Sequence, residues 1–364
     1  MLRSHRASIL WWFAFLIYGA PVFAATDAPL PPLQPAPQPI KPPHIALLLP
    51  TGSDAFGKAA DAVREGFAEA SKKHVGPPLT IRLYPVTEDP RQLAAAYREA
   101  AGAGARIVVG PLTRNGVTAI ATAINPLPVP TLALNVADGL AANPPNLYTL
   151  SLQIESEARQ IAQVALKDGR RKALTITDPS PLGRRMRDAF VDEFERGGGF
   201  RIADYPYATD AGTLERLRQA AATGAVDMVF LALDAGRARA VRPQVSTLPA
   251  YGTSQIDPGT NAANFIDLDD LRFVDMPWLL QPDHPAVMVY SRPGPRGPDE
   301  IERLRALGID AFRIAETLYE GKRLAELDGV TGRLSLAPDG QIRRVLPVAV
   351  INGGQVSVLP DPPK

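Results

Sequence analysis

The chain of 364 residues is long enough for about two domains, and an apolar fraction of 46% is enough for a buried core. A formal net charge of +1 gives the protein no electrostatic reason to bind nucleic acid, so we expect no nucleic-acid partner. The absence of cysteine excludes disulfides, thiolate catalysis, cysteine zinc sites and a lipid anchor on an N-terminal cysteine.

Residues 1–24 have the pattern of a signal peptide. Arg3 and Arg6 form a basic start, and residues 9–18 form an apolar stretch too short to span a membrane. Val22-Phe23-Ala24 is a small-x-small cleavage site. We therefore expect export with cleavage of this segment. The alternative is that the segment stays as an uncleaved membrane anchor.

Residues 25–43 are predicted to be a proline-rich linker. Their eight prolines forbid helix and favour polyproline II. At ~3.1 Å per residue, such a segment reaches on the order of 50 Å. The linker either holds the folded part away from the exporting membrane or is a disordered leader with no role.

Strands and helices alternate from His44 to Leu134, with short loops between them. The apolar run His44–Leu49 predicts a strand that is buried on both faces. A helical stripe follows from Ala59 to Ala70, and Gly66 beside it is expected to permit close packing of this helix on the sheet. Further segments of the same kind predict strands over 79–84, 106–109 and 131–134, and helices near 93–100 and 117–124.

The alternation begins again after an extended segment, 148–152, which predicts a second α/β unit. Its expected strands are 172–177, 200–205 and 226–233, and its expected helices are 155–167, 182–196 and 214–222. Beyond Tyr251 the pattern is less regular, with a helix expected over about 311–327. The end predicts antiparallel strands over 332–336, 341–351 and 355–359, with turns at 338–340 and 352–354.

We therefore predict an α/β fold of two Rossmann-like lobes, joined by hinge crossovers and carrying a C-terminal antiparallel strand segment. One hinge is expected near Leu147–Gln153. Residues 44–151 and about 252–328 are assigned to lobe 1. Residues 152–251 and about 329–360 are assigned to lobe 2.

The sequence contains no recognisable catalytic or metal-binding motif. Its four histidines do not pair at ligand spacing, so we expect no metal site. No G-x-S-x-G, H-E-x-x-H or P-loop pattern occurs, so we expect no enzymatic activity and no cofactor. The pairs Arg184-Arg185 and Arg343-Arg344 are expected on solvated faces, the alternative being that they grip an anionic ligand or partner.

The loops at the carboxyl ends of the strands are the candidate ligand site. Ligands of open α/β sheets bind there, where helix N-termini and backbone N–H groups are free. Small hydroxyl and amide groups hydrogen-bond a neutral or zwitterionic ligand without reacting with it. For any single residue, capping of a helix is the simpler explanation. The candidates are Thr51, Ser53, Thr113, Asn115, Asn135, Asp178 and Ser254.

Several motifs together resemble the LppC/LpoA family of penicillin-binding protein activators. The start, His44–Pro50 with Ala62–Phe67, is similar to many type I periplasmic binding domains, of which the leucine-binding protein is one. The more particular motifs are Gly110–Thr113, Arg171–Leu174 before Asp178, Tyr251–Gln255, Leu307–Phe312, Gly332–Leu336 and Gly340–Arg344. The resemblance covers about residues 44–351.

The resemblance implies a type I periplasmic binding-protein fold and a non-enzymatic, periplasmic regulator of peptidoglycan synthesis. Such a regulator binds a bifunctional penicillin-binding protein and raises its activity. Family members are often outer-membrane lipoproteins, but this chain has no cysteine to acylate. Many also carry a helical-repeat domain, where this chain has only the proline-rich linker.

Two alternatives stay open. The first is a periplasmic solute-binding protein for a small amino-acid-like or amide ligand, in transport or sensing. It predicts ligand uptake with closure of the lobes. The second is an enzyme, an alternative that no catalytic motif in the sequence supports.

Overall fold

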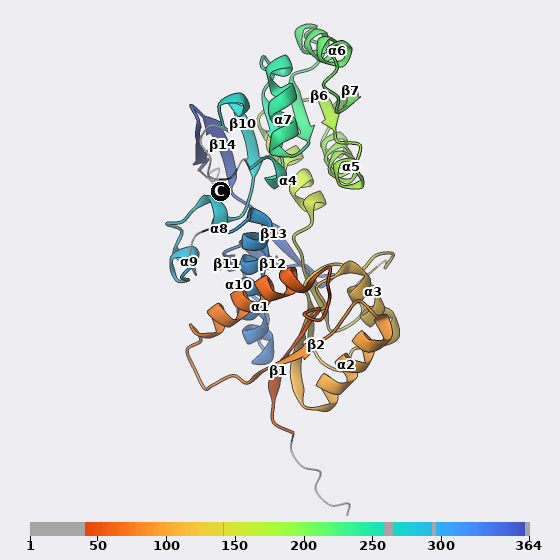
Figure 1. Cartoon of the computed structure of the whole chain (residues 1–364), viewed down its shortest axis with the longest axis vertical. Helices are drawn as coiled ribbons and strands as arrows, with labels where there is room; N and C mark the ends of the chain where they lie inside the picture. Colours follow the sequence, from red (N-terminus) through yellow and green to blue (C-terminus); the bar gives the residue numbers. More distant parts are fainter. Residues whose placement is uncertain (1–40, 141, 258, 260–264, 293–295, 361–364) are drawn as a thin grey trace, which may run out of the picture. The chain divides into compact units, whose positions relative to one another are not determined.

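The computed structural model describes residues 41–360 apart from 141, 258, 260–264 and 293–295 (Figure 1). The expected signal peptide lies outside the described residues, as does the expected linker up to residue 40. Residues 41–43, at the end of that linker, are exposed and have no regular secondary structure. Within the described ranges, no helix combines the length and the apolar character needed to cross a membrane.

The first sheet has eight strands in the order β11-β12-β13-β5-β4-β3-β1-β2. Strands β1 to β5 pair in parallel, and β13 joins β5 in parallel. Antiparallel pairing of β11, β12 and β13 completes the sheet. Its strands are β1 (His44–Leu49), β2 (Ile81–Pro85), β3 (Ala105–Val109), β4 (Thr131–Ala133), β5 (Leu147–Leu150), β11 (Leu327–Gly329), β12 (Gly332–Leu336) and β13 (Gln341–Val345).

Helices cover both faces of this sheet, as the fully buried sequence of β1 predicts. Ile45, Leu47 and Leu49 pack in the same cluster as residues of α1 and α10. Ala46 and Leu48 point the other way and pack with α2 and α3. These helices are α1 (Gly57–Ser71), α2 (Pro90–Gly102), α3 (Arg114–Ala123) and α10 (Asp299–Tyr319).

The second sheet has seven strands in the order β15-β14-β10-β9-β8-β6-β7. Strands β6 to β10 pair in parallel, and β14 and β15 add antiparallel pairs. The strands are β6 (Lys172–Thr177), β7 (Phe200–Pro206), β8 (Met228–Ala232), β9 (Ala250–Gly252), β10 (Leu271–Val274), β14 (Val348–Asn352) and β15 (Gln355–Val358). The accompanying helices are α4 (Ile154–Lys167), α5 (Pro181–Arg196), α6 (Ala211–Ala222) and α7 (Ala235–Val241), with 3₁₀ turns η1 (Arg242–Val245), η2 (Ser254–Ile256) and η4 (Ile266–Leu268). Two short helices follow β10: α8 (Pro277–Leu280) contacts α10 and β15, and α9 (Pro285–Met288) contacts β11.

The two sheets confirm the predicted α/β fold with two Rossmann-like lobes. The chain first passes from one sheet to the other at residues 151–153, inside the segment where we expected a hinge. Later passages lie between β10 and α10 and between β13 and β14.

Beyond residue 252 the sheets divide the chain differently from the expected boundaries. Strand β10 pairs with β9 in the second sheet, although about 252–328 was expected in lobe 1. Strands β12 and β13 belong to the first sheet, although about 329–360 was expected in lobe 2. The expectation was wrong for these strands because the sequence of a strand of four or five residues does not reveal which of two sheets it joins.

The expected single strand over 341–351 is two strands in different sheets. Strand β13 ends at Val345 and β14 begins at Val348, and Leu346-Pro347 joins the two sheets. Pro347 has no N–H to donate to a ladder. The backbone N–H and carbonyl of Leu346 bond instead to the side-chain amide of Gln160, at 3.0 and 2.7 Å. The proline was therefore the signal for the break.

The late helix starts twelve residues before its expected start at 311 and ends at Tyr319. Pro298 precedes it, and the acids Asp299, Glu300 and Glu302 occupy its first turn, where they favour a helix N-terminus. Gly321, at a φ of +71°, follows its end. Residues 299–310, which include Gly308, were therefore not expected in the helix.

Helices α1 and α10 cross in close contact at two glycines (Figure 1). A Cβ on Gly66 would lie 1.9 Å from the carbonyl oxygen of Arg305. A Cβ on Gly308 would lie 2.0 Å from the carbonyl oxygen of Val63. We expected Gly66 to permit helix–sheet packing, but its close neighbour is another helix, because α10 shares this face of the sheet with α1.

We predict that Gly308→Ala lowers the free energy of unfolding by about 1–3 kcal/mol, because the added methyl forces the two helices apart. The loss is expected although alanine favours a helix interior over glycine by about 1 kcal/mol. Gly102→Ala, at the end of α2, is the control, since no heavy atom lies within 4 Å of a Cβ placed there. Urea unfolding measures both. Equal stability of Gly308→Ala and wild type would contradict the tight crossing.

Candidate functional site

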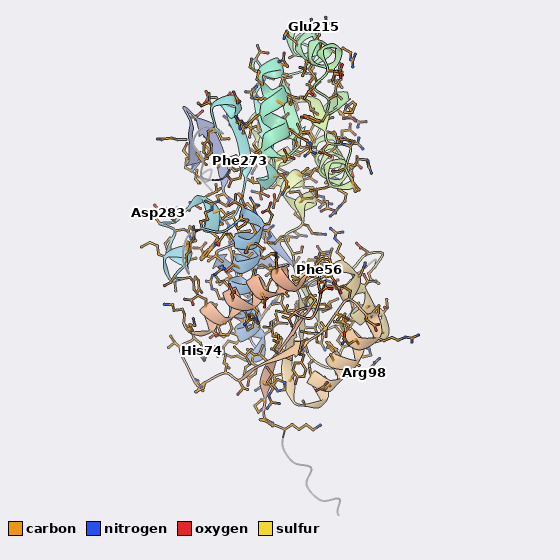
Figure 2. The ribbon with its side chains drawn as sticks, viewed as in Figure 1. Phe56, His74, Arg98, Glu215, Phe273 and Asp283 are labelled. Carbon is orange, nitrogen blue, oxygen red and sulfur yellow. The ribbon has the colours of Figure 1, made fainter. Side chains whose placement is uncertain are left out.

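A cleft of about 630 Å³ lies where we expected ligands, at the carboxyl ends of strands of both sheets. Its walls come from the loops after β3 and β4 of the first sheet and after β9 and β10 of the second. Phe56, labelled in Figure 2 at the N-terminal end of α1, is one of its apolar lining residues. The others are Ala59, Leu112, Leu134, Leu152, Ile154, Leu182, Met276, Leu304 and Leu307.

Four of the seven candidate residues line this cleft. Thr113 accepts a hydrogen bond from the Gly116 N–H at 3.2 Å and so caps α3. Asn135 donates to the Leu112 carbonyl at 3.1 Å, and the Ser254 N–H donates to Glu157 at 3.0 Å. Asn115 is exposed on the first turn of α3. Three of the four therefore have structural hydrogen bonds already.

The other three candidates, Thr51, Ser53 and Asp178, do not line the cleft. Ser53 accepts from the Phe56 N–H at 3.0 Å and donates to Glu88. Asp178 accepts from the Ser180 N–H at 2.7 Å, and this bond, with the nearby charge of Arg237, lowers the pKa of Asp178. Thr51 lies half-buried in the turn after β1.

Two buried ion pairs beside the cleft were not expected from the sequence. Arg344 of β13 lies 3.7 Å from Glu157 of α4, and their side chains are 4% and 7% exposed. Arg303 of α10 pairs with Asp275, which follows β10, and their side chains are 12% and 1% exposed. We call these four side chains the crossover network, because they lie on segments next to the passages between the sheets.

Backbone groups complete the crossover network. Arg344 donates to the carbonyls of Ser151 and Thr331 at 2.9 and 3.0 Å. Arg303 donates to the Ser254 carbonyl at 3.1 Å, while Ser254 donates its own N–H to Glu157. Asp275 accepts from the Met276 N–H at 2.7 Å. Buried charges are tolerated only with this kind of pairing.

Burial sets the electrostatics of the network. It raises the pKa of Glu157 and lowers that of Arg344, and the charge of each partner opposes the shift of the other. Burial also disfavours the charged form of Arg303, but adjacent Asp275 outweighs this and raises its pKa. Removing or neutralising either acid would leave the guanidinium beside it as a buried charge without a partner.

The expectation of a solvated arginine pair at 343–344 is wrong for Arg344. Arg343 is exposed, but Arg344 shares the inward face of β13 with Ile342. Side chains alternate across a strand, so the apolar Ile342 was the available signal that Arg344 points inward. No local sequence pattern identifies Glu157 as the partner of Arg344.

A second ionic cluster joins the two walls of the cleft. Glu155 of α4 accepts from Arg185 of α5 at 2.7 Å and lies 3.4 Å from Arg114 of α3. Arg114 also pairs with Asp138 at 3.1 Å. Burial opposes ionisation of Glu155, but its own backbone N–H and Arg185 outweigh burial and lower its pKa. The arginines that line the cleft are thus occupied by acids of the same chain.

The lining of the cleft is suited to binding. No group of three histidine, aspartate or glutamate side chains that could hold a metal ion exists in the described part of the chain. The cleft presents apolar side chains and a few amides, its arginines face acids of the same chain, and Glu88 is exposed beside them. Such a surface can bind an apolar group or an amide.

We predict that Arg344→Ala lowers the free energy of unfolding by roughly 3–5 kcal/mol, because it leaves Glu157 buried without a partner. Arg343→Ala, one residue away and exposed, is the matched control and should change stability by no more than about 0.5 kcal/mol. Adding Glu157→Gln to Arg344→Ala should recover part of the loss. Chemical denaturation of the wild type, the two single variants and the double variant measures these changes in stability. Equal losses for Arg343→Ala and Arg344→Ala would refute the network.

We also predict a pH effect from Asp257, whose side chain is 5% exposed. Burial, helped by the charge of Asp275, raises the pKa of Asp257 to about 6 from an ordinary value of 3.8. The folded state therefore binds this proton more tightly, and its contribution to stability is lost as the pH rises through about 6.

Replacing Asp257 by Asn, which keeps the oxygen that accepts from Gly259, should remove this contribution. Between pH 4 and 7 the wild type should lose on the order of 1–3 kcal/mol more than Asp257→Asn. Unfolding free energies of the wild type and Asp257→Asn, measured at several pH values, test this prediction. Parallel curves for the two proteins would mean that Asp257 titrates normally.

Comparison with known proteins supports the same fold. Residues 36–350 match the family described as "LppC putative lipoprotein". The chain is 27% identical over 316 residues to the penicillin-binding protein activator LpoA of Edwardsiella piscicida, covering 74% of this chain and 45% of that protein. It is 27% identical over 311 residues to LpoA of Serratia proteamaculans, covering 73% and 45%. The chain therefore spans about half the length of the curated relatives it matches.

Solved structures also resemble this one. A Chromobacterium violaceum protein described as a "putative branched-chain amino acid ABC transporter" is 38% identical with a TM-score of 0.73, covering 85% of this chain and 100% of that one. The C-domain of Haemophilus influenzae LpoA, described as a regulator of PBP1A, is 20% identical with a TM-score of 0.71, covering 87% and 99%. At that identity the second likeness concerns the fold alone.

Proposed function

This chain belongs to the LppC family, and we propose that it is a non-enzymatic regulator that binds a bifunctional penicillin-binding protein and raises its activity in peptidoglycan synthesis. The names of its relatives support this proposal, since the proteins it matches from Edwardsiella and Serratia are penicillin-binding protein activators. We place its action in the periplasm, with residues 1–24 as the export signal.

The observation that carries the proposal is the internal pairing of the arginines at the cleft. A receptor for a free amino acid needs charged or strongly polar groups that stay available for the ligand's carboxylate and ammonium. Here Arg114 and Arg185 contact Glu155, and Arg303 contacts Asp275. A protein that acts through its surface on a partner has no need of free charges in its cleft.

The alternative is a solute-binding protein for a small amino-acid-like or amide ligand. Its support is the 38% identity to the Chromobacterium protein described as a transporter, together with the apolar lining and the amides of Asn115 and Asn135. A ligand with an apolar side chain and an amide would suit this lining better than a charged one.

We predict that the purified protein retains a bifunctional penicillin-binding protein from solubilised envelope and raises its rate of glycan polymerisation or cross-linking in a reconstituted assay. The effect should not require an added small molecule, since the cleft arginines are paired within the chain. A protein of similar size and no relation serves as the control. If the protein neither retains the synthase nor changes its rate, the regulator proposal is contradicted.

Calorimetry separates the two functions. The solute-binding alternative predicts binding of leucine or a related amide with a Kd on the order of 1 μM, equivalent to about −8 kcal/mol. The regulator proposal predicts no such binding. Micromolar binding together with no effect on the synthase would favour the alternative.

A further inference from the structure

A second groove, of about 990 Å³, lies between helix α4 and strand β13. It shares only Gln153 with the lining of the cleft. We call it the α4–β13 groove. Neither the regulator proposal nor the solute-binding alternative assigns it a role.

Regular spacing brings its lining side chains together. On α4, Ser156, Arg159, Gln163 and Lys167 follow each other at intervals of three and four residues, so they form one stripe along the helix. On β13, Gln341, Arg343 and Val345 alternate with the buried Ile342 and Arg344, so they share the outward face. Both stripes line the groove.

The groove carries uncompensated positive charge. Arg159, Lys167 and Arg343 are exposed, and none of them makes an ion pair or a side-chain hydrogen bond with any described residue. The acids of the lining are already engaged. Asp168 pairs with Arg272 and accepts from Tyr251 at 2.8 Å, and Glu193 pairs with Arg196 and accepts from Gln163 at 2.8 Å.

We propose that the α4–β13 groove holds an extended acidic peptide segment of the synthase. This assignment rests on the proposed function, because it names the surface through which the regulator holds its partner. The free cations match carboxylates, the amides of Gln153 and Gln341 can bond to a peptide backbone, and Val345, 45% exposed, offers an apolar contact.

The spacing of the cations specifies the segment further. Arg159 and Lys167 are eight residues apart on one helix, which corresponds to about 12 Å. An extended peptide advances about 3.3 Å per residue, so it would meet both cations with acidic residues about four positions apart. A groove with two walls suits a single chain better than a flat anionic membrane surface.

The test uses a fluorescein-labelled, otherwise neutral peptide with glutamate at every fourth position, and the same peptide with glutamine instead. Fluorescence anisotropy should detect binding of the acidic peptide only, weakening as salt is added. The triple variant Arg159→Glu, Lys167→Glu, Arg343→Glu should bind about tenfold more weakly or worse. The triple variant Lys73→Glu, Arg91→Glu, Arg323→Glu makes the same charge change elsewhere and should stay within about twofold of wild type.

Equal loss in the two triple variants would overturn the proposal, because general charge would then explain binding. Tighter, groove-dependent binding to phosphatidylglycerol vesicles than to the peptide would also overturn it in favour of a membrane surface. The synthase assay separates this proposal from the function on which it rests. If the wild type stimulates the synthase and the groove variant does so equally, the groove assignment fails and the regulator stands. If the peptide binds the groove but the wild type leaves the synthase unaffected, the synthase is excluded as the occupant.

Discussion

The pairing of Glu157 with Arg344 and of Asp275 with Arg303 is the constraint on which the centre of this protein depends. Each ion loses its water on folding, at a cost of several kcal/mol, and only a partner at the right place offsets that cost. The partners come from α4, β13, α10 and the segment after β10. Folding therefore has to bring together segments nearly two hundred residues apart before Glu157 and Arg344 are satisfied, whereas Asp275 and Arg303 are only 28 residues apart.

The same constraint determines what the neighbouring cleft can do. Ser254 and Arg303 are hydrogen-bonded to each other within the network. Glu155 pairs with Arg114 and Arg185, one from each wall of the cleft. What is left for a ligand is an apolar lining with a few amides and the exposed carboxylate of Glu88. Free cations occur instead on the α4–β13 groove, so the surface that can attract a charged partner is separate from the cleft. This division suits a protein of the LppC family that acts on another protein rather than on a solute.

Most of the regular fold could be predicted from the sequence, because strands such as β1 and helices such as α5 carry their own periodicity and punctuation. The failures have tertiary causes. Nothing within β10 or β12 tells which sheet will accept it. The break at Pro347 is different, because the proline itself was a local signal for it within the apolar run 345–351. The site was predictable only in outline. Of the seven residues chosen by the rule that ligand loops follow the strand ends, Thr113, Asn115, Asn135 and Ser254 line one cleft, and their contact with a ligand stays a prediction. The charges that define its character were not predictable, because an ion pair between residues 157 and 344 has no local signature.

The central claim is that the protein acts without a small-molecule ligand, since the arginines of its cleft are paired with acids of the same chain. Its most direct test strips the purified protein of bound small molecules by unfolding in denaturant, dialysis and refolding, and then measures its effect on the synthase. The account predicts the same stimulation as for the untreated protein. Stimulation that is lost after this treatment and returns only when a low-molecular-weight extract of the envelope is added would contradict it.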